Sequence, residues 1–158
     1  MKTHLLVICI IISSMSVLAQ SKKQVKKYKI KASAESSIEN GKIINENKTI
    51  YDSNGNEIEV TNYNKEGIIK SIHKYKYNSD NDETEDEQYD ASNKLIEKKL
   101  TKYNSSKDKI EEIYNDATGK VIKKHTYVYD KNGLKTERKT VDAEGKIISV
   151  KKFVYITK

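Results

Sequence analysis

The residue types that could do chemistry in this chain are tyrosines, carboxylates and histidines. The sequence has eleven tyrosines, while tryptophan and proline are absent and the single cysteine, Cys9, lies in the N-terminal apolar run. A Gly-x-Ser-x-Gly nucleophile elbow and a glycine-rich phosphate loop are both missing from the sequence. We therefore expect no catalytic residues, no cofactor and no enzymatic activity.

Metal binding is the next chemistry to weigh, because carboxylates crowd the stretch from Asp80 to Glu87, "DNDETEDE". The glycine and the bidentate glutamate of an EF-hand loop do not follow at the required offsets. His73 and His125 occupy strands about four steps apart, which places them ~19 Å from each other in a regular sheet. We expect no metal site. The histidines should face solvent, and the acidic strand should pair with the lysines of residues 73–76 and 97–99.

The tyrosines carry the strongest signal, because five of them are evenly spaced. Tyr51, Tyr77, Tyr103, Tyr129 and Tyr155 follow one another at intervals of 26 residues. Gly67, Asn93, Gly119 and Gly145 keep the same interval, each sixteen residues after a tyrosine of the series. A fixed period of this length indicates an internal structural repeat.

Turn chemistry recurs twice in each repeat, as in "YDSNG" from Tyr51 and "YNKEG" from Tyr63. Asp or Asn at the first turn position accepts backbone hydrogen bonds, and Gly or Asn at the fourth takes a left-handed conformation. Segments of strand length, rich in Ile, Val, Thr and Tyr, separate the turns. The structural turn residues are Gly41, Gly55, Gly67, Gly119, Gly133 and Gly145.

These patterns predict an all-β fold, an antiparallel meander of about ten strands that is open and twisted or curled. We expect no helix in the mature domain, one weakly apolar face, and tyrosine rings that cover the turns with their hydroxyls in water. Because Tyr114 is eleven residues after Tyr103, we also expect a distorted turn at residues 105–109. The predicted strands cover residues 43–51, 57–63, 68–77, 83–89, 95–103, 109–114, 120–129, 134–141 and 146–156.

The N-terminus differs from the repeats. Lys2, an apolar run from Leu5 to Ile12 and a final Val-Leu-Ala are typical of a secretory signal peptide over residues 1–19. The apolar run is too short to span a membrane, which needs ~18–20 residues. We expect a basic segment over residues 20–40 with a first strand, a repeat domain over 41–158, and export to the periplasm or the cell exterior.

The motifs "YDSNG…YNKEG" and "YDKNG…VDAEG" resemble the YD repeats of bacterial RHS proteins and small exported repeat proteins of uncharacterised function. The resemblance covers most of the chain after the signal peptide and concerns turn chemistry, so it implies architecture. RHS-type proteins build large β-shells around toxic domains, whereas this chain is too short to enclose another domain. The resemblance carries over no catalytic residue.

Two functions are consistent with these observations. The first is a non-catalytic binding or interaction module of the bacterial envelope, with a polysaccharide or an envelope protein as its partner. The alternative is a structural spacer without a dedicated ligand. The net charge of +7 is compatible with nucleic acid, but export argues against that partner. The candidate ligand-contact residues are Tyr75, Tyr77, Tyr103, Tyr127 and Tyr129.

Overall fold

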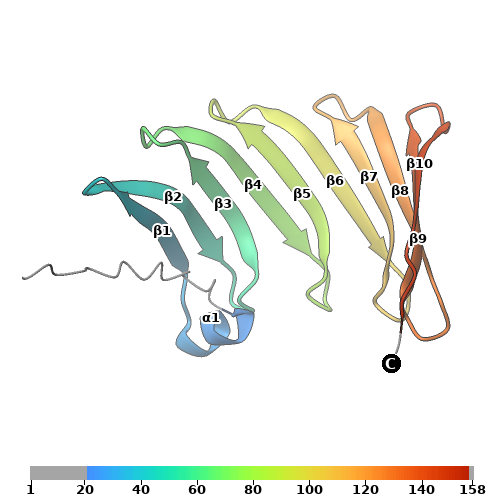
Figure 1. The fold of residues 1–158 in the computed structure, drawn as a ribbon. Helices are drawn as coiled ribbons and strands as arrows, with labels where there is room; N and C mark the ends of the chain where they lie inside the picture. The colour runs from blue at the N-terminus through green and yellow to red at the C-terminus, as the bar shows by residue number, and fades with distance from the viewer. Residues whose placement is uncertain (1–20, 157–158) are drawn as a thin grey trace, which may run out of the picture.

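The computed structural model describes residues 21–156, which form one ten-stranded sheet preceded by a short helix (Figure 1). The predicted signal peptide lies outside the described residues. Each strand pairs antiparallel with its neighbours in sequence, in the order β1 to β10. The elements are α1 (Lys22–Tyr28), β1 (Ala32–Glu39), β2 (Lys42–Tyr51), β3 (Glu57–Tyr63), β4 (Ile69–Tyr77), β5 (Glu83–Asp90), β6 (Leu95–Tyr103), β7 (Lys109–Asp116), β8 (Val121–Tyr129), β9 (Lys135–Asp142) and β10 (Ile147–Lys152).

The predicted antiparallel meander is confirmed, and most strand boundaries agree with prediction to within two residues. A first strand, β1, lies in the basic N-terminal segment. The largest boundary error is at β10, which ends at Lys152 rather than at Ile156. The expectation of no helix is wrong, because α1 forms before the strands. Its first turn is closed by a capping box between Ser21 and Gln24, and Lys29 ends it in the left-handed conformation.

Eight turns share one hydrogen-bonding pattern, as the turn chemistry predicts. In the turn at Asp116, the carboxylate Oδ1 accepts the N–H of Thr118 at 2.8 Å and that of Lys120 at 3.0 Å. All six turn glycines have positive φ, as predicted. The other turns of this pattern begin at Asp52, Asn64, Asn78, Asp90, Asn104, Asp130 and Asp142.

The predicted distortion at residues 105–109 is wrong. The turn that begins at Asn104 has the same hydrogen bonds as the others, and Lys107 takes the glycine position with φ 67°. The error arose from Tyr114, which does not open the next turn. Asp116 opens that turn, and Asn115 precedes it where Tyr63 and Tyr89 stand in earlier repeats.

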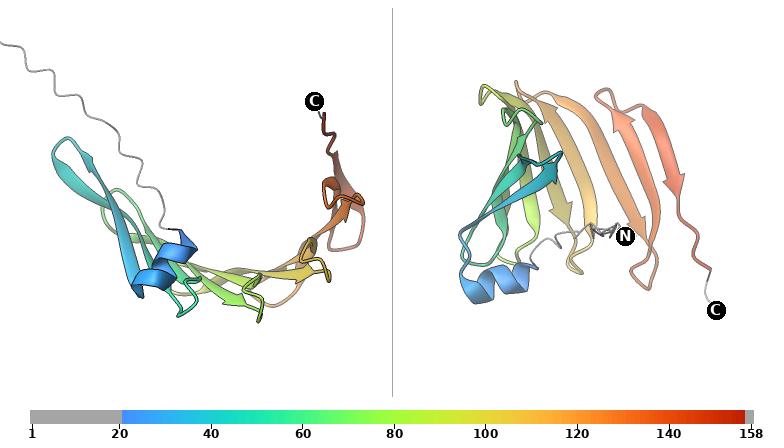
Figure 2. Two further views of the ribbon diagram at one scale, coloured as in Figure 1. Left: turned by 90° about the horizontal axis from the view of Figure 1, so that it is seen from below. Right: turned by 60° about the vertical axis from the view of Figure 1, so that its left-hand side comes forward.

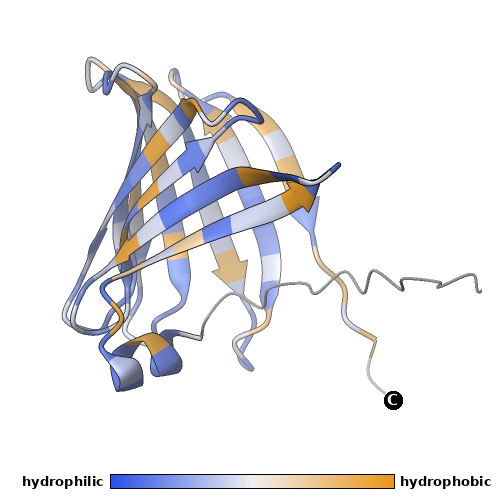
Figure 3. Cartoon of the chain, turned by 90° about the vertical axis from the view of Figure 1, so that its left-hand side faces the viewer, coloured by the Kyte–Doolittle hydropathy of each residue, from blue (hydrophilic) through white to orange (hydrophobic). Residues whose placement is uncertain are grey.

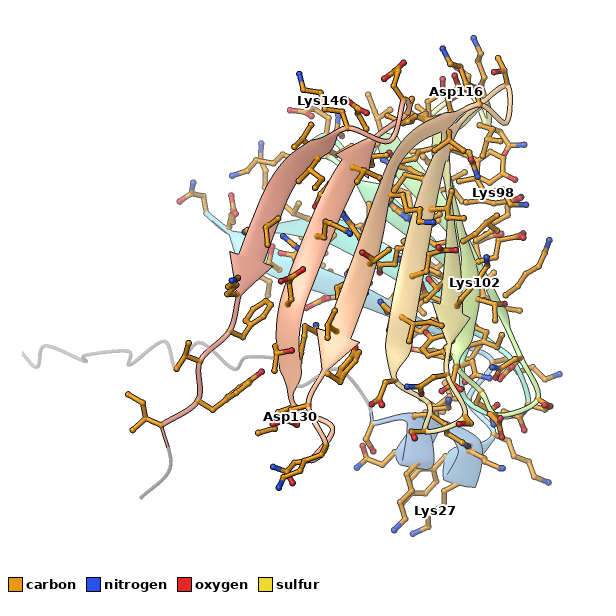
Figure 4. All side chains as sticks on the ribbon, turned by 90° about the vertical axis from the view of Figure 1, so that its right-hand side faces the viewer. Lys27, Lys98, Lys102, Asp116, Asp130 and Lys146 are labelled. Carbon is orange, nitrogen blue, oxygen red and sulfur yellow. The ribbon has the colours of Figure 1, made fainter. Side chains whose placement is uncertain are left out.

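The sheet is curved, so that β1 and β10 bend toward the same side (Figure 2). We call the hollow side the inner face and the other side the outer face; Lys98 and Lys102 point outward (Figure 4). Apolar positions are scattered along the strands without forming a continuous band (Figure 3). Among the described residues, Val25 of α1 is the only buried hydrophobic side chain. The sheet is therefore held mainly by backbone pairing, turns and polar side-chain contacts.

The turn glycines offer a matched test of how α1 docks. A Cβ on Gly55 would lie 2.6 Å from the backbone oxygen of Lys22 in α1, whereas a Cβ on Gly119 would meet nothing within 4 Å. Both residues have positive φ, so Gly119→Ala should lower the free energy of unfolding by about 1 kcal/mol. Gly55→Ala should cost clearly more, because α1 must also shift. Urea denaturation measures both, and equal costs would show that α1 contributes nothing at this turn.

Candidate functional site

Two depressions lie beside the predicted tyrosines, at the end of the strands where α1 is located. The first has a volume of about 380 Å³ and contains Tyr75 and Tyr77, and the second, of about 580 Å³, contains Tyr127 and Tyr129. Every residue that lines the first has an equivalent in the second, two repeats later in the chain. The second depression is lined by Asn104, Ser106, Asp108, Ile110, Tyr127, Val128, Tyr129, Asp130, Lys131 and Gly133.

Local sequence explains how these residues meet. Tyr127 and Tyr129 end β8, directly before the turn that begins at Asp130. The turn at Asn104 lies two strands away on the same edge, because β6, β7, β8 and β9 are consecutive in the sheet. Asp or Asn at each turn start keeps the backbone of the turn folded back, which leaves the space between two neighbouring turns open.

Four of the five evenly spaced tyrosines are fixed by a repeated hydrogen bond, which sequence reasoning missed. The hydroxyl of Tyr77 donates to the carbonyl oxygen of Glu57 at 2.8 Å, and that of Tyr103 donates to Glu83 at 2.8 Å. Tyr129 and Tyr155 make the same bond 20 residues back, to Lys109 and Lys135. The expectation that these hydroxyls stay in water is therefore wrong. Each ring is held across the neighbouring strand and has a structural role.

The first depression is partly occupied by contacts of the protein itself. Asn56, only 3% exposed, donates its amide to Asn81 Oδ1 at 3.0 Å. The ammonium group of Lys22 in α1 lies 3.5 Å from the carbonyl oxygen of Asn81 and 5.9 Å from the ring centroid of Tyr77. In the second depression, Gly133 replaces Asn81, so that no side chain bridges the two turns there. The second depression is thus the larger of the two, at about 580 Å³ against about 380 Å³.

Tyr127 also belongs to a polar cluster on the inner face. Glu112, only 5% exposed, accepts hydrogen bonds from the hydroxyls of Tyr127 and Tyr114 and from the ammonium group of Lys109. Burial alone would raise the pKa of Glu112, but the bonds from Lys109 and Tyr127 outweigh it and lower the pKa. Burial and the Glu112 bond raise the pKa of Tyr127. Glu112 therefore stays ionised and orients the Tyr127 ring.

The histidines do not face bulk solvent as expected. His73 Nδ1 lies 3.0 Å from Asp86 Oδ1, and both side chains are largely covered. His125 Nδ1 lies 2.9 Å from Thr140 Oγ1, with the Tyr114 ring against its edge. Burial, together with the nearby Arg138 and Lys123, lowers the pKa of His125. Cross-strand packing on the inner face accounts for both positions.

The acidic strand β5 pairs with lysines, as predicted. Glu85 contacts Lys76 at 2.5 Å and Lys98 at 2.9 Å on the outer face, and Glu83 contacts Lys99 at 2.9 Å on the inner face. Among the described residues, no group of three His, Cys, Asp or Glu side chains is arranged to hold a metal ion. The charge of the "DNDETEDE" stretch is thus offset by lysines on β4 and β6.

The structure divides the five predicted contact tyrosines into three places. Tyr75 and Tyr77 line the first depression, Tyr127 and Tyr129 line the second, and Tyr103 lies between them in neither. Tyr103 has Thr101 two residues earlier, where the other pairs have a second tyrosine. The polar residues Asn104, Ser106, Asp108 and Lys131 were missed as site residues. Their signal was present, because they belong to turns whose positions the period had fixed.

Comparisons with known proteins give no family. No family model matches the chain, and no curated protein matches it. A solved Bacteroides fragilis protein of unknown function is 16% identical, with a TM-score of 0.46 over 80% of this chain and 96% of its own. S. aureus TarM in complex with Fondaparinux, alpha-GlcNAc-glycerol and UDP is 16% identical, with a TM-score of 0.32 over 79% of this chain and 22% of its own. Within residues 21–156, no helix has the length and apolarity to cross a membrane.

Proposed function

We propose that this protein is a non-catalytic glycan-binding module whose contact site is the second depression. The observation that carries the proposal is the set of side chains gathered there: two tyrosine rings surrounded by Asn104, Ser106, Asp108 and Lys131. A sugar ring has apolar C–H faces and hydroxyl groups around its rim. An aromatic ring packs against the C–H faces of the sugar. Amide, hydroxyl, carboxylate and ammonium groups form hydrogen bonds with its hydroxyl groups.

Preorganisation supports the same site. Tyr129 is held by the carbonyl oxygen of Lys109, and Tyr127 is held by Glu112, so neither ring must be ordered when a ligand binds. The ammonium group of Lys135 lies 4.9 Å from the centroid of Tyr127 and further restrains that ring. Binding to rings that are already fixed avoids much of the entropic cost of ordering side chains.

A polymer is the favoured form of the ligand. The two depressions are separated by four strands, a spacing of about 19 Å in a regular sheet. An extended polysaccharide along this edge reaches both, whereas a monosaccharide reaches one. The setting we propose is the bacterial envelope or the cell exterior, because residues 1–19 have the pattern of a signal peptide. The alternative function is that of a spacer. One observation favours the spacer: the internal hydrogen bonds of the tyrosines explain the use of tyrosine without a ligand.

A glycan array tests this function first, followed by titration of the best ligand against matched variants. Tyr127→Ala should weaken binding at least about fivefold, since the loss of one stacked ring costs on the order of 1–3 kcal/mol. Tyr75→Ala is the matched control, because it makes the same change in the depression that the protein itself partly occupies. We expect a much smaller effect from it.

Two exposed polar positions separate binding from folding. Ser106→Ala and Lys131→Ala remove side-chain groups that line the site and hold no part of the sheet together, so both should reduce affinity without a change in melting temperature. If no glycan on the array, and no material from the bacterial envelope, retains the wild-type protein, the spacer function replaces the binding function.

A further inference from the structure

Both ends of the sheet are free edges. Within residues 21–156, β1 pairs only with β2 and β10 pairs only with β9, while every other strand has two neighbours. A free edge presents a row of unpaired backbone N–H and C=O groups, which is a template for pairing with another strand. The two edges of this chain differ in charge, which suggests what they accept.

We propose that the β10 edge of one copy of this chain pairs, antiparallel, with the β1 edge of a second copy. The charges of the two strands are complementary. β1 carries Glu35 and Glu39 and has no basic residue. β10 carries Lys151 and Lys152 and has no acidic residue. Opposite charges on neighbouring strands attract, whereas like charges facing each other destabilise the pair.

The repeat makes the two edges geometric complements as well. Tyr155 follows Tyr51 by four periods, so the segment after Lys146 corresponds to β2. In the chain, β2 pairs with β3 through residues 47–51 and 57–62. β1 lies one period before β3. The free side of β10 is thus equivalent to the side of β2 that pairs with β3. Because β1 is equivalent to β3, β1 of a second copy has the matching side.

The last strand, β10, is shorter than its equivalents in earlier repeats, as expected of a strand that lacks a neighbour on one side. β10 has six residues, while its equivalents β2, β4, β6 and β8 have nine or ten. The segment that follows remains in place, because Tyr155 still donates to the carbonyl oxygen of Lys135 at 2.8 Å. Val154 is 87% exposed and Ile156 is 97% exposed. A strand of a second copy would extend β10 over this segment and cover these side chains.

Pairing of β10 with β10 is the competing arrangement between two copies. It would bring Lys151 and Lys152 of one copy beside the same residues of the other, which the β10–β1 arrangement avoids. The proposed contact is head-to-tail, so it produces a closed ring if the rotation between copies closes and a filament if it does not. The proposed contact does not involve the proposed glycan site, which lies at the turns at one end of the strands and not on an edge strand.

Sedimentation velocity of the purified protein over a wide concentration range tests the proposal, with two charge-reversal variants. Glu35→Lys/Glu39→Lys makes β1 basic, and Lys151→Glu/Lys152→Glu makes β10 acidic. The wild type should gain mass with concentration, and each variant alone should remain monomeric. An equimolar mixture of the two variants should associate again, because the basic β1 of one then meets the acidic β10 of the other.

Two further proteins keep the result interpretable. Glu66→Lys/Asp80→Lys reverses two exposed charges in the turns after β3 and β4, away from both edge strands, and should associate like the wild type. Val154→Pro removes one edge donor. The preceding N–H, of Phe153, points to Thr136 of β9 at 3.0 Å, so that of Val154 points to the free edge. This variant should keep its circular dichroism spectrum and lose association.

The proposal is overturned if the wild type stays monomeric at the highest concentration. It is also overturned if either charge-reversed variant associates like the wild type, or if the mixture does not regain association. Association that survives in both charge-reversed variants but is lost in Val154→Pro would point to a β10–β10 contact instead.

Discussion

A variant that combines Tyr77→Phe, Tyr103→Phe and Tyr129→Phe should unfold with a free energy about 3 kcal/mol below that of the wild type. Each change removes a hydroxyl that donates to a backbone carbonyl at 2.8 Å and leaves the ring in place. An intramolecular hydrogen bond contributes about 1 kcal/mol net, and three equivalent sites in separate repeats should add. Urea denaturation followed by circular dichroism measures the difference.

The matched control is Tyr28→Phe. Tyr28 is 65% exposed, and within residues 21–156 its hydroxyl has no hydrogen-bond partner. This change should leave the midpoint of unfolding within error of the wild type. A triple variant as stable as the control would show that the evenly spaced hydroxyls are solvated, and the repeat would then need another explanation for its tyrosines.

Glu112→Gln should lower the free energy of unfolding by about 2 kcal/mol. Glu112 is 5% exposed and accepts hydrogen bonds from Lys109, Tyr114 and Tyr127. Hydrogen bonds to an ionised group contribute about 1.5–3 kcal/mol, and the uncharged amide keeps only part of them. Glu111→Gln is the control on the outer face. Its lysine partners, Lys102 and Lys124, are exposed to solvent, so its cost should stay below about 1 kcal/mol.

The pH dependence of stability provides a second readout for Glu112. Its pKa is lower in the folded protein than in the unfolded chain, so the unfolded chain binds the proton more tightly. The stabilisation is therefore present above the unfolded pKa of about 4.3 and is lost as the pH falls through the folded pKa. The wild type should lose more stability than Glu112→Gln on acidification below about pH 4.3. Parallel stability curves for the two proteins would contradict the lowered pKa.

The repeat could be predicted from sequence because it rests on local chemistry. Asp or Asn at the start of a turn and Gly at its fourth position act within five residues, so their spacing fixed the strands without knowledge of tertiary contacts. Helix α1 was missed for the opposite reason. Its lysine-rich sequence lacks an apolar stripe, and it is held by a local capping box, by the burial of the single residue Val25 and by the fit of its backbone on Gly55. Neither feature leaves a periodic signal.

The candidate site was predictable in part. The repeat pointed to Tyr75, Tyr77, Tyr127 and Tyr129 as candidate contact residues, and in the structure they line two equivalent depressions. Which depression is partly filled by the protein's own contacts could not be predicted, because Asn56, Asn81 and Lys22 meet across the first depression from three separate segments. The hydrogen bonds of the tyrosine hydroxyls could not be predicted either, because they join residues 20 positions apart. Their acceptors are backbone carbonyls, which every residue has, so the sequence has no pattern that marks them.

The most direct test of the glycan-binding function is to map the contact residue by residue. Backbone amide chemical shifts should be recorded while the best saccharide from the array is titrated into isotope-labelled protein. We expect saturable changes that are largest in the turns at Asn104 and Asp130, around Ser106 and Lys131, and that are lost in Tyr127→Ala. Largest changes on the outer face around Lys98 and Lys102, or no saturable change for any saccharide tested, would contradict it.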